Sequence, residues 1–185
     1  MKAVLISIQP KWCELIANGK KTVEVRKTRP KLETPFKCYI YCTKDNTDYI
    51  PSRIWWKADE TGFQHIMNGT VIGEFVCNCM TALKADNMVQ AYYNNIKDTC
   101  LTDEEIKRYA SGKKLYYWHI SNLVIYDAPK ELSEYYRECE EPYCDDCPHL
   151  CFENTPNSYE GWCKYDEKIP ITRPPQSWCY VEELR

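Results

Sequence analysis

Residues 18–26 read Asn-Gly-Lys-Lys-Thr-Val-Glu-Val-Arg, the pattern of a helix end followed by a strand. The glycine is the residue type that most readily adopts the left-handed conformation in which helices end. After it, side chains alternate with the two-residue period of a strand, so Val23 and Val25 share one face while Glu24 and Arg26 share the other. With the valines buried, an acid and a base lie in a row beside a helix end. This arrangement predicts a polar cleft built on the strand.

The flanking segments predict a fold that mixes helices and strands. Residues 3–8 are apolar and β-branched, as in a buried strand, and Pro10 suits the first turn of a short helix. Further strands are predicted at 36–43, 70–80, 114–126 and 178–184, and further helices at 85–97 and 102–110. Five or six strands interrupted by short helices indicate an α+β fold with a closed or half-closed sheet.

Length and charge narrow the class of protein. At 185 residues the chain is expected to form one domain, 1–185, with room for a hydrophobic core. The formal net charge of −3 gives no overall field that attracts nucleic acid, so a nucleic-acid site has to be a local patch. No run reaches the roughly 18 apolar residues of a membrane span, and the apolar start is too short for a signal peptide. We therefore expect a cytoplasmic protein without a membrane partner.

The stretch Gly19-Lys20-Lys21-Thr22-Val23-Glu24-Val25-Arg26 resembles the G-x-K-x-x-E-x-R signature of ASCH domains, which belong to the PUA-like superfamily. Its position after a strand, Gln-Pro and a short helix strengthens the resemblance. The family implies a small β-barrel of five to six strands with flanking helices. It also implies a cleft between the first helix and the barrel, lined by the motif. Members of the family are linked to RNA.

One bacterial branch of the family hydrolyses the acetyl amide of acetylcytidine with a Lys, a Thr and a Glu. The resemblance puts the Lys on Lys21 and the Glu on Glu74, in the middle of the strand predicted at 70–80. The Thr falls on Glu24, and a carboxylate does not replace an activated hydroxyl in acyl transfer. Lys21, Glu24 and Glu74 are therefore candidate catalytic residues for acid–base chemistry, and whether the chain is an enzyme stays open.

Candidate ligand-binding residues lie on the motif strand, at the start of the first helix and on both sides of Pro174-Pro175. They are Gln9, Trp12, Arg26, Arg173, Gln176, Ser177 and Trp178. The two prolines stiffen the last segment, so it is predicted to return to the rim of the cleft. Plainer interpretations remain. The charged residues of the motif could form a solvated strand face with weak ion pairs. Trp12 could be a core residue, and Trp178 could fill the end of the barrel.

Five cysteines fall between residues 138 and 165, in a segment with little apolar content of its own. The pair Cys144-x2-Cys147 is a knuckle whose thiolates can reach one tetrahedral zinc at about 2.3 Å. We predict a structural zinc in a cysteine-rich, zinc-knuckle-like insertion at 138–165. The predicted ligands are Cys144, Cys147, Cys151 and Cys163, with Cys139 or His149 as substitutes.

Two classes of function fit the sequence. The first is an ASCH-type module that binds RNA, a nucleotide or a nucleoside in the polar cleft. The second is a hydrolase of a modified nucleoside (an acetylcytidine-type amide) or of RNA that uses Lys21 and Glu74 with Glu24. A third and weaker hypothesis is a protein that acts through protein contacts. The oligomeric state is left open.

Overall fold

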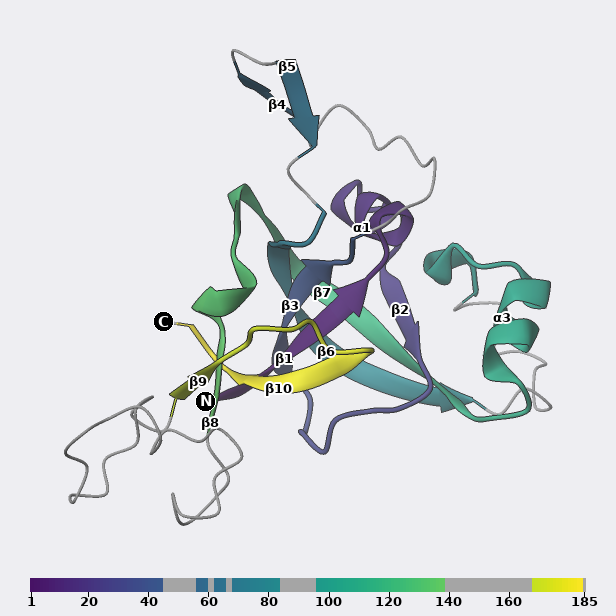
Figure 1. The fold of residues 1–185 in the computed structure, drawn as a ribbon. Helices are drawn as coiled ribbons and strands as arrows, with labels where there is room; N and C mark the ends of the chain where they lie inside the picture. Colours follow the sequence, from purple (N-terminus) through teal and green to yellow (C-terminus); the bar gives the residue numbers. More distant parts are fainter. Residues whose placement is uncertain (45–55, 60–61, 66–67, 84–95, 139–167, 185) are drawn as a thin grey trace, which may run out of the picture.

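The computed structural model of the protein describes residues 1–44, 56–59, 62–65, 68–83, 96–138 and 168–184 (Figure 1). Six strands form one mixed sheet, in which β1 and β3 are parallel and the other neighbours are antiparallel. In sheet order they are β10 (Trp178–Glu182), β1 (Lys2–Ile8), β3 (Phe36–Cys42), β6 (Val71–Leu83), β7 (Leu115–Lys130) and β2 (Val23–Arg26). The α+β class and the six strands expected from the sequence are thus present.

The helices are short. Helix α1 (Pro10–Ala17) begins at a proline, and Gly19 follows its end with a φ of +68°. Helix α3 (Asp103–Ala110) is capped by Thr102, whose side chain accepts from the Glu105 backbone while Glu105 accepts from the Thr102 backbone. The smaller elements are β4 (Trp56–Asp59), β5 (Gly62–His65), η2 (Leu132–Glu134), β8 (Tyr136–Glu138) and β9 (Lys168–Pro170). Most of the helix predicted at 85–97 lies outside the described residues.

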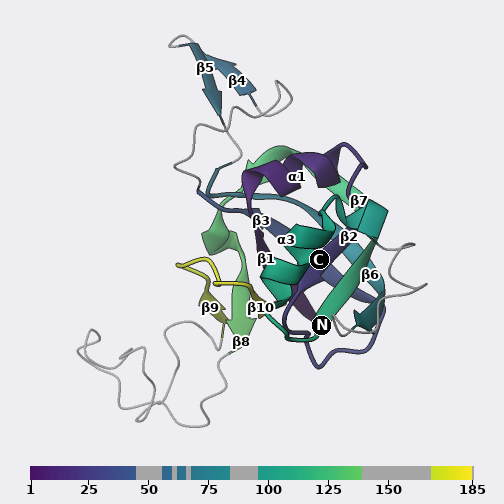
Figure 2. The same cartoon turned by 90° about the vertical axis from the view of Figure 1, so that its right-hand side faces the viewer.

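The sheet curls strongly. Strands β2 and β1 are separated by β7, β6 and β3, which in a flat sheet is about 19 Å at ~4.8 Å per strand. Yet Arg26 Nη2 on β2 donates to the Ser7 carbonyl on β1 at 2.6 Å. The two edges therefore turn toward one another, with α1 across one end and α3 beside β2 (Figures 1 and 2). No strand ladder joins β2 to β10 among the described residues, so the sheet is half-closed, which is one of the two arrangements expected from the sequence. A closed form of the β-barrel that the resemblance implies is not shown.

The inside of the curl is an apolar core, and β2 takes part in a second one. Side chains such as Ile6, Ile40 and Trp118 fill the inside. On the outer side, Val23 and Val25 pack with residues of α3. Because the strand alternates, burying the two valines under α3 turns the acidic and basic side chains of β2 toward β1 and α1. No helix in the described ranges is long and apolar enough to cross a membrane.

Candidate functional site

A cleft of about 820 Å³ opens where β1 leads into α1 and β2 begins. It lies between these elements, α3 and the segment 174–176. Its lining residues are Ser7, Ile8, Gln9, Trp12, Lys21, Glu24, Val25, Arg26, Lys27, Thr43, Leu101, Glu105, Arg108, Tyr109, Pro174, Pro175 and Gln176. Five of the predicted site residues of the N-terminal third and Gln176 of the C-terminal segment are therefore part of one cleft.

Lys21 is 2% exposed, and its ammonium group is fully used by the protein. It donates to the carbonyls of Val23 (2.9 Å) and Thr99 (2.8 Å), and Nζ lies 3.2 Å from Glu24 Oε2. A lysine has three donors, so no further acceptor is needed. On an ideal strand Lys21 would point away from Glu24. Here its backbone N–H still bonds to Leu15 at the end of α1, and β2 begins only at Val23, so the two side chains meet.

Glu24 joins two cations. Its second oxygen, Oε1, lies 3.0 Å from Arg26 Nη2, and its side chain is 9% exposed. The buried group of Lys21, Glu24 and Arg26, which we call the motif triad, carries one negative and two positive charges and hence a net charge of +1. Both carboxylate oxygens are occupied by the protein's own cations, which leaves Glu24 poorly suited to hold a metal ion.

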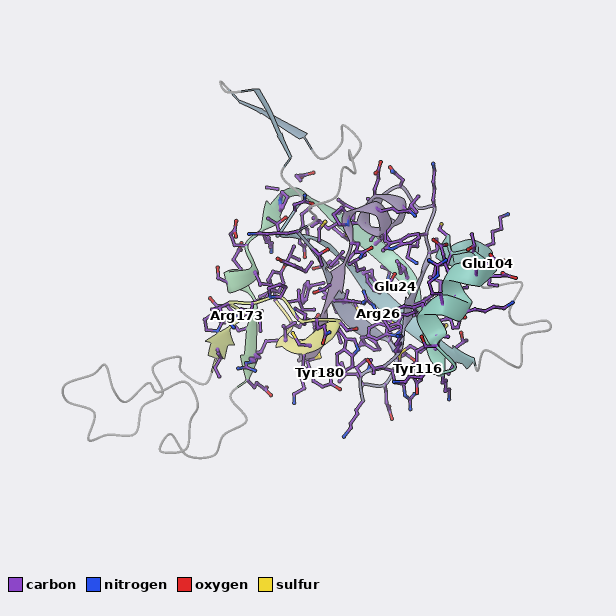
Figure 3. All side chains as sticks on the ribbon, turned by 45° about the vertical axis from the view of Figure 1, so that its right-hand side comes forward. Glu24, Arg26, Glu104, Tyr116, Arg173 and Tyr180 are labelled. Carbon is purple, nitrogen blue, oxygen red and sulfur yellow. The ribbon has the colours of Figure 1, made fainter. Side chains whose placement is uncertain are left out.

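Arg26 is the triad member with an unused donor. Its Nη2 donates to Ser7 and contacts Glu24, but its buried Nε has no hydrogen-bond partner among the described residues. A buried N–H without an acceptor is unfavourable by about 1–3 kcal/mol. In Figure 3, Glu24 and Arg26 lie between α3 and β10, in the part of the molecule where the cleft opens.

The rim of the cleft is rich in cations and aromatic rings. Trp12, half-buried, has Lys11 Nζ at 4.4 Å and Lys21 Nζ at 5.3 Å from its ring centre. Lys27 Nζ lies 4.8 Å from the ring centre of Tyr109. The lining contains four basic and two acidic side chains, so the cleft is positive by two charges in a chain whose formal net charge is −3. The cleft is therefore a local positive patch, which a nucleic-acid site would need in a chain of negative net charge.

The C-terminal segment reaches the rim only in part. Ser7 Oγ donates to the Pro175 carbonyl at 2.6 Å, which holds Gln176 at the cleft, and the Ser7 N–H donates to the carbonyl of Ser177. Arg173 lies apart from Arg26 (Figure 3) and lines a separate cavity of about 390 Å³.

Trp178 belongs to the packing of the sheet and does not line the cleft. Its ring centre lies 6.1 Å from that of Trp118, and its Nε1 donates to Thr28 Oγ1 at 2.9 Å. Of the four residues predicted for the rim, Gln176 lines the cleft, whereas Arg173, Ser177 and Trp178 are not among its lining residues. The plainer interpretation of Trp178, as a residue that packs at the end of the sheet, describes its contacts.

Glu74 is also outside the cleft, which corrects the expectation that it meets Lys21. It accepts from Tyr126 Oη at 2.7 Å and from Lys37 Nζ at 3.0 Å. Burial opposes ionisation of Glu74, but the Tyr126 hydrogen bond and the Lys37 ammonium hold its pKa below the ordinary value. Its cationic partner thus comes from the neighbouring strand β3 and not from the motif.

Sequence reasoning missed the contribution of α3 to the cleft. Glu105, Arg108 and Tyr109 line it, while Ile106 and Ala110 on the same helix are buried. The sequence predicts that this helix is amphipathic, but it does not predict that the helix packs against β2.

The predicted zinc ligands lie at 144–163, outside the described residues, so the zinc site stays a prediction. Within the described ranges no group of three or more His, Cys, Asp or Glu side chains could hold a metal ion. Cys13, Cys38, Cys42 and Cys77 are buried, whereas Cys79 is exposed and Cys100 and Cys179 are half-buried, so only four of these seven cysteines are core side chains.

Protein purified without added zinc is expected to carry about one equivalent of the metal. Chelation should disorder 138–165 and leave the six-stranded sheet folded, because the ligands lie within the insertion. Metal analysis and thiol titration measure both effects. Far less than one equivalent together with fully reactive thiols would contradict the prediction.

The curled mixed sheet and the cation-rich cleft beside its first helix define a small α+β domain. The chain matches the family model of the ASCH domain over residues 6–164. It shares its fold with the crystal structure of ASCH from Zymomonas mobilis, with a TM-score of 0.56 and 16% identity over 98% of this chain and 88% of that chain. Structures of two single-substitution mutants of that protein give TM-scores of 0.56 and 0.52, also at 16% identity, covering 98% and 99% of this chain and 89% and 92% of theirs. No curated protein matches. The chain belongs to the ASCH domain family.

Proposed function

We propose that the chain binds RNA or a nucleotide through the cleft, with a phosphate group received beside Arg26. The observation that carries the proposal is the buried Arg26 Nε, an N–H donor that finds no acceptor in the described protein. A phosphate oxygen would satisfy this donor with a charge-assisted hydrogen bond. The motif triad retains one uncompensated positive charge, which favours an anion.

Trp12 supplies the second element of such a site. Its ring is half-buried at the rim and has two lysine ammonium groups near it, at 4.4 and 5.3 Å from the ring centre. An aromatic face beside cations suits stacking of a nucleobase, with its phosphate directed to the cations. Gln9 and Gln176, both exposed on the rim, offer amide groups for base edges.

The geometry gives less support to the hydrolase hypothesis. The Lys21 ammonium group is engaged by two backbone carbonyls and by Glu24, so none of its donors is left for a substrate. Both carboxylate oxygens of Glu24 are engaged by Lys21 and Arg26, so neither is left for a substrate. Glu74 belongs to a different network. Binding without turnover is therefore the function we propose.

Two neighbouring cations on α3 provide a matched test. Arg108 and Lys107 are both exposed, but only Arg108 lines the cleft. Arg108→Ala is expected to weaken binding of a short single-stranded RNA about three- to tenfold. It should also reduce the salt dependence by about 0.7 on a log–log scale, since one phosphate contact is lost. Lys107→Ala should change neither quantity.

The measurement is fluorescence anisotropy at several salt concentrations, with analysis of the RNA after incubation. Equal effects of the two substitutions would mean that the cleft is not the binding site. If the wild-type protein cleaves or modifies the RNA and Lys21→Ala does not, the hydrolase hypothesis would replace the proposal of binding without turnover.

A further inference from the structure

A row of cations and tyrosines continues from the cleft along the loop that joins β2 to β3. Three of its cations follow one another at every second position of the loop, and the fourth is the residue immediately before β7. We call this surface the basic–aromatic track and define it by Lys27, Arg29, Lys31, Lys114, Tyr109, Tyr116 and Tyr180.

Three of the four cations, Lys27, Arg29 and Lys114, lie beside rings of the track. The Arg29 guanidinium carbon is 5.9 Å from the ring centre of Tyr116, and Lys114 Nζ is 5.5 Å from the same centre. All four cations and Tyr109 are exposed, whereas Tyr116 and Tyr180 are half-buried. Figure 3 shows Tyr116 and Tyr180 on the same side of Arg26, one toward α3 and the other at β10.

The track is continuous with the cleft. Lys27 and Tyr109 belong to both. Tyr116 is the register partner of Arg26 across β2 and β7, so the two side chains share one face of the sheet. The loop itself is anchored, because the Lys31 N–H donates to Tyr180 Oη at 2.7 Å.

The positive charge of the track is not neutralised by the described protein. None of Lys27, Arg29, Lys31 and Lys114 lies within 4.0 Å of a described carboxylate. The loop 27–35 contains one acid, Glu33, against three cations. Four exposed cations, three of them beside tyrosine rings, form a surface that attracts a chain of anions interleaved with flat groups.

We infer that the track extends the cleft into a path for a single strand of RNA several nucleotides long. The inference rests on the proposed function, in which one nucleotide occupies the cleft. A single strand is favoured over a duplex because only unpaired bases can stack on Tyr109 and Tyr116. Phosphates of the following nucleotides then meet Lys27, Arg29, Lys31 and Lys114.

The test compares two triple variants on ligands of increasing length. The track variant is Arg29→Ala, Lys31→Ala, Lys114→Ala. The control variant is Lys20→Ala, Lys97→Ala, Lys107→Ala, which removes three exposed cations that line neither the cleft nor the track. Both lose the same net charge. The probes are uridine 5′-monophosphate and oligouridylates up to about nine nucleotides long.

For the wild-type protein and the control, affinity is expected to rise about tenfold or more from the monophosphate to the longest oligomer. The track variant should bind the monophosphate normally and the longest oligomer at least tenfold more weakly than the control. Its salt slope should be smaller by about 2, since each lost phosphate contact contributes about 0.7.

The inference is overturned if both triple variants bind the oligomers equally, or if affinity does not rise with length. It is also overturned if a duplex of the same length or polyglutamate binds as tightly as the single strand. In each of these cases the proposed function still holds if the wild-type protein binds the monophosphate and Arg108→Ala weakens that binding. Absence of binding to every probe overturns both.

Discussion

Glu24→Ala is expected to lower the free energy of unfolding at neutral pH by about 3–5 kcal/mol. The carboxylate lies between the Lys21 ammonium and the Arg26 guanidinium, at 3.2 and 3.0 Å. All three side chains are buried, so removal of the one anion leaves two like charges without compensation. For a chain of this length the melting temperature should fall by about 6–20 °C.

Urea unfolding followed by circular dichroism measures this loss. Thr22→Ala is the control, because Thr22 lies in the same stretch but is exposed. Adding Lys21→Met to Glu24→Ala should recover part of the stability, since it removes one of the two unpaired cations. A loss below about 1 kcal/mol for Glu24→Ala would show that solvent reaches the triad and screens its charges.

Local signals in the sequence predicted the elements around the site well. The proline at the start of α1, the glycine after it and the Thr102 capping box each act within a few residues, and each is present in the structure. The valines of β2 are buried as their alternation predicted. The convergence of Lys21 with Glu24 follows from the same local geometry, because β2 begins only after the turn that ends α1.

The partner of Glu74 and the position of α3 depend on long-range pairing, which the sequence pattern does not predict. Glu74 needs a cation, and the motif seemed to offer one, but its partner depends on which strand lies beside β6. In the sheet that neighbour is β3, where Tyr39 is opposite Glu74 and Lys37 is diagonal to it. In the same way, the placement of α3 on the outer face of β2 is what brings Arg108 to the cleft. Patterns of one segment do not encode these adjacencies.

The motif triad links stability to binding. A buried group with a net charge of +1 and an unsatisfied N–H is not the most stable arrangement for an empty domain. An anionic ligand that supplies both a charge and an acceptor relieves this cost. Ligand binding should therefore raise the melting temperature of the wild-type protein, by mass action on the folded state.

Arg26→Lys is expected to weaken binding of uridine 5′-monophosphate or a short RNA roughly 10- to 100-fold, the effect of losing a hydrogen bond to a charged group. Lysine keeps the positive charge but has no counterpart of the buried Nε donor that we propose meets the phosphate. It can still reach either the Ser7 carbonyl or Glu24, so the variant should remain folded, with a modest loss of stability. Isothermal titration calorimetry well below the melting temperature separates the loss of affinity from the loss of stability. Arg108→Lys on the exposed rim is the matched control. Its affinity should fall by no more than about twofold, because a rim cation acts on phosphate mainly as a charge. If Arg26→Lys binds as tightly as the wild-type protein, the phosphate does not reach Arg26 and the orientation of the ligand proposed here is wrong.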